Sequence, residues 1–233
     1  MTPPLRALLL PGLMTMVMLA ILLALGTWQA NRMLWKADIL AAIALAERAP
    51  PVPLGPTPPR FARVRAEGVF HPATGLYGAE VRTVATLPTG GARLLAVLRR
   101  DGAPPVLVDR GWVPVAHPAA PPPAMPAEPA TVEGYVRPPD SAGHFAATND
   151  LANRRFFTLD PATIGPALGI PDLAPFILVA LGPPGSPDLD VPDPARTLPR
   201  PANNHLAYAI TWYGLAAGLL VIFALYARKV LRS

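Results

Sequence analysis

Histidine is the side chain with the clearest capacity for site chemistry in this sequence, because cysteine is absent and lysine and serine are scarce. The four histidines are widely separated and form no metal-binding motif; they are His71, His117, His144 and His205. His205 differs from the others because it directly precedes a long apolar run. A neutral imidazole is a good ligand for iron, and aromatic neighbours would suit a flat, hydrophobic macrocycle. The alternative is an interfacial histidine without a ligand role.

Residues that support covalent or nucleotide chemistry are absent or badly placed. No serine lies in a nucleophile-elbow motif, and the two lysines, Lys36 and Lys229, both flank apolar segments. No Walker or dinucleotide-binding glycine pattern occurs. Several arginines could clamp a carboxylate or, alternatively, pair with acids such as Asp109 and Asp160; they are Arg110, Arg154, Arg155, Arg196 and Arg200. The sequence therefore predicts a protein that is not an enzyme.

Two charge-free apolar stretches, residues 7–31 and 206–227, are each long enough to cross a bilayer. An apolar fraction of 52% with only 15% charged residues agrees with membrane segments. A signal peptide cleaved near Ala24 and Gly26 is the alternative for the first stretch, but the run is longer than a signal h-region and Trp28 follows at once. We therefore expect a hairpin of two transmembrane helices.

The net charge of +5 belongs mainly to the ends of the chain. Residues 31–205 contain 16 basic and 15 acidic residues, a net charge of +1, and the other four basic residues lie in short terminal flanks. A basic surface for nucleic acid is therefore not expected. The positive-inside rule places both termini in the cytoplasm; Arg32 and Lys36 favour the opposite orientation, but long loops respond weakly to their own charge.

Small residues predict how the two helices would pack. Gly214 and Gly218 form a small-xxx-small pair, and the first helix offers a matching notch at Ala20 and Ala24. At 100° per residue this glycine pair lies nearly opposite one face of the second helix, formed by His205, Tyr208 and Trp212. Contact through the glycines would leave that face free. The alternative is that the aromatic residues form an ordinary interfacial belt.

The loop between the apolar stretches is rich in proline and in short β-like runs. It holds 30 of the 33 prolines, mostly in connectors at 49–59, 114–129 and 182–201. Seven runs have strand patterns, at 63–70, 75–81, 92–99, 105–113, 131–136, 155–159 and 175–181. Residues 32–48 should continue the first helix, and Asp160 with Pro161 should start a short helix as N-cap and N1. We predict a mostly β, α+β outer domain, built as a small barrel or sandwich.

Five segments distributed along the chain carry a family pattern. They are LGTWQANRMLWK (25–36), RVRAEGVF (63–70), DRGWVPVAHP (109–118), NRRFFTLD (153–160) and NNHLAYAITWYGLAAGLLVIFALY (203–226). Together they resemble the Surfeit locus family of cytochrome oxidase assembly proteins. The first and last segments are the most specific, and the proline-rich stretches match nothing diagnostic.

The resemblance implies an inner-membrane protein with two spans and an outward domain, which helps to assemble haem-copper oxidases. Bacterial members are thought to bind haem a, and the family's histidine at the start of the second span corresponds to His205, which the resemblance makes the iron ligand. From helix geometry and membrane depth we add Tyr208, Trp212 and Trp28 as aromatic walls. The implied partners are oxidase subunit I, haem a synthase and membrane lipid.

The expected organisation is a first span within residues 1–31, an extracytoplasmic domain at 32–205, a second span at 206–227 and a basic cytoplasmic tail at 228–233. A bacterial plasma membrane is expected, because the first span begins near residue 7 without a mitochondrial presequence. Two alternative functions stay open. One is a scaffold that steadies a subunit I intermediate without haem, and the other is a membrane-anchored enzyme with a pocket in the outer domain.

Overall fold

The computed structural model describes residues 3–84, 86–115, 122–125, 127–141, 143, 146–182 and 192–232. The chain divides into two compact units. The helical unit comprises residues 1–42 and 200–233, and the β unit comprises residues 43–199. His117, His144 and parts of the proline-rich connectors at 114–129 and 182–201 lie outside the described residues.

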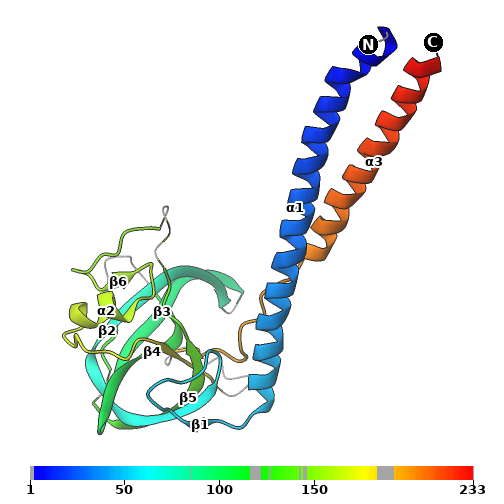
Figure 1. Cartoon of the computed structure of the whole chain (residues 1–233). Coiled ribbons are helices and arrows are strands. Elements are labelled where there is room, and N and C mark those ends of the chain that lie inside the picture. Colours follow the sequence, from blue (N-terminus) through cyan, green and yellow to red (C-terminus); the bar gives the residue numbers. More distant parts are fainter. Residues whose placement is uncertain are drawn as a thin grey trace. The chain divides into compact units, whose positions relative to one another are not determined.

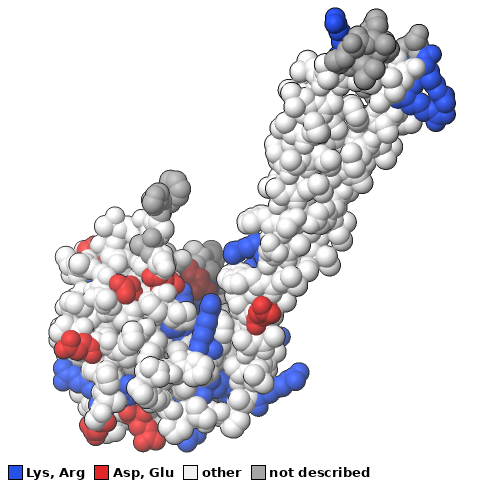
Figure 2. All heavy atoms as spheres, in the orientation of Figure 1, with Lys and Arg blue, Asp and Glu red and all other residues white. Residues whose placement is uncertain are grey.

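Two long apolar helices form the helical unit (Figure 1). α1 spans Pro3–Arg48, with its last turns in the β unit, and α3 spans His205–Arg232. The prediction that residues 32–48 continue the first helix is confirmed. By length and composition both helices can cross a membrane. Figure 2 shows Lys and Arg side chains at the end of the helical pair where both termini lie.

The two helices contact each other by fitting aromatic rings of α3 beside glycines of α1. A Cβ atom on Gly26 would lie 2.8 Å from Cε1 of Tyr213, and one on Gly12 would lie 3.4 Å from Cζ of Phe223. Buried and half-buried residues of α3 recur every three or four positions; they are His205, Ala209, Trp212, Ala216, Leu219, Phe223, Ala227 and Val230. This spacing is typical of helices that pack side by side with interlocking side chains.

The predicted helix contact through Gly214 and Gly218 is wrong, because a Cβ atom on either would meet no heavy atom within 4 Å. Their expected counterparts on α1 are exposed as well. The reason is angular, since each glycine is two residues, or about 200°, away from the buried Ala216. The side of α3 that carries His205 and Trp212 therefore faces α1 instead of being free.

A sheet that closes on itself forms the β unit (Figure 1). Its ring follows the order β2 (Arg63–Val84), β3 (Leu87–Arg100), β4 (Ala103–Pro114), β7 (Ile177–Ala180) and β5 (Pro129–Arg137). β5 pairs with the first part of β2 and closes the ring. Two short strands, β1 (Val52–Pro53) and β6 (Arg155–Phe156), pair in parallel with β2. Of the two predicted architectures, the small barrel is the one observed.

The strand predictions at 63–70 and 75–81 describe one long strand, β2, instead of two. Its pairing with β3 is irregular between Phe70 and Thr74 and between Tyr77 and Glu80. Such irregularities bend a strand and increase its twist. β2 can therefore pair with β5 along Arg63–Val69 and with β3 along the remainder, which is the geometry that closes the barrel.

Alternate residues of the barrel strands fill its interior, as the period of a β-strand requires. They include Val64, Ala66, Ala96, Leu98, Val106, Val108, Val132, Val136, Leu178 and Ala180. The short helix α2 (Pro161–Ala167) begins as predicted, with Pro161 at N1 and with Asp160 accepting a hydrogen bond from Ala162 N at 3.2 Å. Ile164 of α2 is fully buried, so this helix packs onto the β unit.

Candidate functional site

His205 is the first residue of α3, and a side chain of α1 holds its ring. The two atoms in contact are His205 Nδ1 and Gln29 Oε1, 2.7 Å apart. The chain just before α3 is held by a second contact with α1, since Asn203 Nδ2 donates to the Met33 carbonyl at 3.2 Å. Both contacts lie within the helical unit. They fix the imidazole against α1.

The hydrogen bond to Gln29 determines which ring nitrogen of His205 carries the proton. A side-chain amide oxygen can only accept a hydrogen bond, so Nδ1 must be the donor. In a neutral imidazole the other nitrogen, Nε2, then has the free lone pair. The hydrogen bonds of the described residues include none to Nε2. The arrangement leaves one nitrogen, with no hydrogen-bond partner in the described part of the chain, that could bind an electrophile such as a metal ion.

Two of the three predicted aromatic walls are exposed. Tyr208 is 56% exposed and Trp28 is 54% exposed. A hydrogen bond of 3.1 Å between Thr27 Oγ1 and the Tyr213 hydroxyl marks one flank of the helix pair. Trp28 is 100° from Thr27, and Tyr208 is five residues, about 140°, from Tyr213. Trp28 is also two residues, about 200°, from Gly26, which packs against α3, so Trp28 lies on the side of α1 away from α3. Tyr208 lies on the flank of α3 opposite Tyr213.

Trp212 occupies a different position from the one predicted for it. It is half-buried on the side of α3 that faces α1, and its indole Nε1 is buried without a hydrogen-bond partner among the described residues. Trp212 therefore packs in the helix interface, below His205. The sequence alone placed it on a free face because the wrong pair of small residues was assigned to the helix contact.

Most of the arginines that the sequence singled out have partners within the protein. Arg110 does not pair with Asp109; its guanidinium lies 4.7 Å from the centre of the Phe70 ring, and burial lowers its pKa. Asp109 instead accepts from Arg93 Nε at 2.5 Å.

The remaining predicted arginines belong to both units. Arg196 pairs with Asp193, and the Arg154 carbonyl accepts from Leu76 N at 2.9 Å. Arg155 is the first residue of β6, and Arg200 is part of the helical unit.

A polar cluster on the barrel was not found by sequence reasoning. Asp140 accepts from the Tyr77 hydroxyl at 3.1 Å and from Arg137 at 2.7 Å, and burial raises the pKa of Tyr77. Arg137 lies three residues before Asp140, but Tyr77 lies 63 residues before it, and none belongs to a motif. Each hydrogen bond in the cluster joins two protein groups, so the cluster stabilises the fold.

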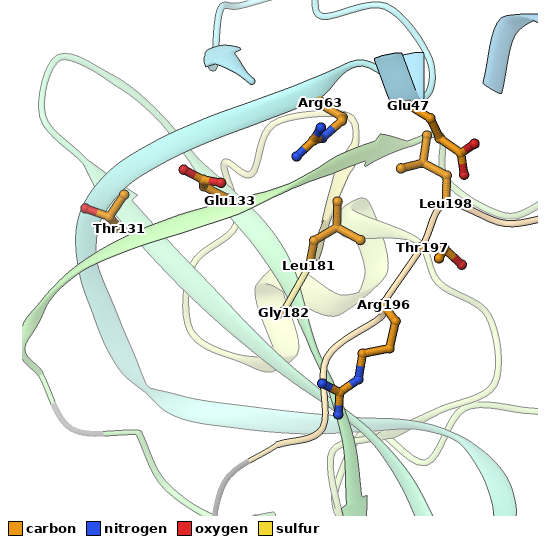
Figure 3. Close-up of a pocket in the computed structure, with 9 residues that line it drawn as sticks. All are labelled: Glu47, Arg63, Thr131, Glu133, Leu181, Gly182, Arg196, Thr197 and Leu198. Atoms are coloured by element: carbon orange, nitrogen blue, oxygen red, sulfur yellow. The ribbon is translucent and has the colours of Figure 1, made fainter. Parts of the chain in front are cut away.

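A cavity of about 710 Å³ lies within the β unit (Figure 3). Its lining combines two acids with two arginines and small or apolar residues; they are Glu47, Arg63, Thr131, Glu133, Leu181, Gly182, Arg196, Thr197 and Leu198. Glu133 already accepts from Arg65. Because the lining carries both signs of charge, it favours neither an anionic nor a cationic ligand.

The described residues contain no group of three or more His, Asp or Glu side chains that could hold a metal ion. His71, the other described histidine, has a buried Nδ1 without a hydrogen-bond partner among the described residues. His205, at the start of α3, is the candidate ligand with the clearest partner for one ring nitrogen in the part of the chain that the structure describes. Gln29 was missed by sequence reasoning, although its segment GTWQ was noted for other reasons.

A closed β-barrel placed in sequence between two long apolar helices, with one partnered histidine at the start of the second helix, defines a narrow class of helix-flanked barrel proteins. The chain belongs to the SURF1 family, whose model matches residues 16–217. Members of this family are known as cytochrome oxidase assembly factors, which indicates an assembly role in preference to catalysis.

Similar proteins occur in bacteria and in animals. A SURF1-like protein of Rickettsia bellii is 29% identical over 221 residues, covering 94% of this chain and 91% of that protein. A SURF1-like protein of Rickettsia felis is 27% identical over 223 residues, covering 94% and 98%. The Surfeit locus protein 1 of Takifugu rubripes is 25% identical over 228 residues, covering 88% and 92%. The similarity therefore extends over almost the whole chain.

Proposed function

We propose that this chain is a membrane-bound haem a chaperone for the assembly of cytochrome c oxidase. The observation that carries the proposal is the hydrogen bond between His205 Nδ1 and Gln29 Oε1, because it leaves Nε2 with a free lone pair. Family membership supplies the context of oxidase assembly. The proposed location is the plasma membrane of a bacterium, with the β unit in the periplasm.

The distribution of charge supports this orientation. The basic residues near the start of α1 and the end of α3 are Arg6, Arg228, Lys229 and Arg232, at the end of the helical pair where both termini lie (Figure 2). Basic residues in short flanks favour the cytoplasmic side. His205, at the other end of α3, would then lie at the periplasmic face of the plasma membrane.

The residues around His205 fit a flat, hydrophobic ligand that contains iron. Imidazole nitrogen binds haem iron, and aromatic rings pack well against a macrocycle. Tyr208 is exposed on a flank of α3 and is available as a wall, whereas Trp28 is exposed on the side of α1 away from α3. Trp212 supports the site from within the helix interface. We assign His205 as the iron ligand and Tyr208 and Trp212 as its surroundings.

The proposed role is to bind haem a and transfer it, and not to catalyse a reaction. Haem a is the cargo, and its iron offers a coordination position that a histidine nitrogen can fill. His205 would hold the iron with one protein bond, while the exposed ring of Tyr208 would shield the macrocycle from water. A site with one protein ligand binds the haem iron less firmly than a site with two. The histidines of subunit I could therefore displace His205 and take over the haem. Haem a synthase would be the donor.

The test is the absorption spectrum of the full chain, purified in mild detergent from cells that make haem a. We expect a haem a spectrum for the wild type and its loss or shift for His205→Ala. His71→Ala is the matched control, because it removes a histidine from the β unit and should leave the spectrum unchanged. A His205→Ala variant that keeps the wild-type spectrum would refute His205 as the iron ligand. A colourless wild type would refute haem binding by this chain.

A scaffold that binds subunit I without haem is the second candidate. It is favoured by exposed apolar side chains near the turn between β2 and β3, where Val81 is 70% exposed and Leu87 is 67% exposed. On this reading His205→Ala leaves oxidase assembly intact, whereas Val81→Asp with Leu87→Asp impairs it. Measurement of assembled oxidase in cells that carry each variant distinguishes the two functions.

A further inference from the structure

We propose that Gln29 is a positioning residue, which sets the tautomer of His205 and directs Nε2 to the ligand; this inference rests on the proposed function. The only hydrogen bond of the His205 ring among the described residues is the one to Gln29 Oε1, at 2.7 Å. Histidine ligands in metal sites commonly use one ring nitrogen for the metal and the other for such a partner. Gln29 supplies that partner from the opposite helix.

The backbone of α1 holds Gln29 in place on both sides. Three residues before it, Gly26 packs closely against the Tyr213 ring, and four residues after it, the Met33 carbonyl accepts from Asn203. Thr27 adds a hydrogen bond to the Tyr213 hydroxyl. The backbone at Gln29 is therefore positioned relative to α3 by contacts that do not involve His205, as expected for a preorganised site.

The chemical nature of the partner suits a site that must release its ligand. A carboxylate in place of Gln29 would pull more strongly on the Nδ1 proton and make the imidazole a stronger donor to iron. A neutral amide orients the ring with a smaller increase in donor strength. It also avoids placing an unpaired charge near the apolar part of the helix pair, which would be costly. Gln29 thus combines orientation with moderate ligand strength.

The first test uses the ligand-free full chain in detergent micelles, labelled with 15N-histidine, and records the ring nitrogen signals of His205. For the wild type we expect one protonated nitrogen, Nδ1, and one unprotonated nitrogen, Nε2. In Gln29→Leu the two tautomers should interconvert and their signals should average. Thr211→Val is the matched control, because it removes a side-chain hydrogen bond within α3, from Thr211 Oγ1 to the Ala207 carbonyl, without removing the contact between Gln29 and His205. Unchanged His205 signals in Gln29→Leu would overturn the inference.

The second test measures haem. If haem a binds through His205, Gln29→Leu should weaken binding about 10–100-fold, the range seen when partners of metal-binding residues are lost. Gln29→Glu should keep binding and lower the reduction potential of the iron. A Gln29→Glu variant with an unchanged potential would refute control of ligand strength by Gln29.

The two tests separate this inference from the proposed function. A tautomer that depends on Gln29 in a wild type that binds no haem would refute the chaperone role and leave the positioning of His205 established. Haem binding that requires His205 but is equal in wild type and Gln29→Leu would leave the chaperone role and refute the positioning role.

Discussion

The buried ion pair between Arg93 and Asp109 should be the most sensitive polar contact of the β unit. Asp109 is only 1% exposed, accepts from Arg93 Nε at 2.5 Å and also accepts from Gly111 N at 3.0 Å. Asp109→Ala leaves the arginine without its anion and an amide without its acceptor. Removing one partner of a buried pair costs about 3–5 kcal/mol of the free energy of unfolding. That is a large part of the stability of a typical domain.

Urea unfolding of the full chain in mild detergent, followed by tryptophan fluorescence, measures this loss. Trp112 is 2% exposed and is the one tryptophan in residues 43–199 of the sequence, so it reports on the β unit. With a dependence on urea of about 1–3 kcal/mol per molar, the midpoint should fall by roughly 2 M. The other tryptophans lie in α1 and α3 and report on the helical unit.

Two further variants make the reasoning refutable. Glu133→Ala removes an ion pair with Arg65 that is open to solvent, since the Glu133 side chain is 42% exposed and the Arg65 side chain is 53% exposed. This variant should change the free energy of unfolding by at most about 1 kcal/mol. The double variant Arg93→Met with Asp109→Leu should recover part of the loss, because apolar residues can replace a buried pair. An Asp109→Ala midpoint as high as that of Glu133→Ala would show that the pair contributes nothing through burial.

Two other predictions concern alkaline pH and the helix contact. Burial raises the pKa of Tyr135 above its usual 10.0, so folding favours the protonated phenol; the resulting stabilisation should be complete below pH 10.0 and be lost as the pH rises through the folded pKa. In urea unfolding between pH 9 and pH 11, Tyr135→Phe should therefore lose less stability than the wild type. An equal loss in the two proteins would contradict this prediction. Gly26→Leu should crowd the Tyr213 ring and lower the free energy of unfolding by about 1–3 kcal/mol. The loss should appear as a lower thermal midpoint in near-ultraviolet circular dichroism, whereas Gly214→Leu, at an open position, should leave the midpoint unchanged.

Local patterns were sufficient to predict most elements of this fold. The charge-free runs predicted both long helices, and Asp160 followed by Pro161 predicted the start of α2. The strand runs were located because alternation and turn residues are local signals, although two of them form one strand, β2, and the run 155–159 forms a strand only at Arg155–Phe156. Closure of the barrel could not be predicted in the same way, since it depends on the irregular pairing of β2 near Phe70 and on its long-range pairing with β5.

The candidate site was predicted only in part. His205 stood out because of its place before an apolar run, but nothing local connects it with Gln29, which lies 176 residues earlier in the chain. A glutamine after tryptophan at a membrane interface has no distinct chemical signature. The pairing appears only when the register of the two helices is known, and register depends on side-chain fit and not on composition.

The correction to the helix packing changes what kind of site His205 can form. A histidine on a free face would offer either ring nitrogen, and its orientation would be set by solvent and ligand. The observed packing instead turns His205 toward α1, where Gln29 occupies Nδ1. The glycine that permits this register is Gly26, because a larger residue there would meet the Tyr213 ring at the next turn of the interface. The same contact that joins the helices therefore limits the histidine to one available nitrogen, which is the property that a carrier with a single, exchangeable ligand requires.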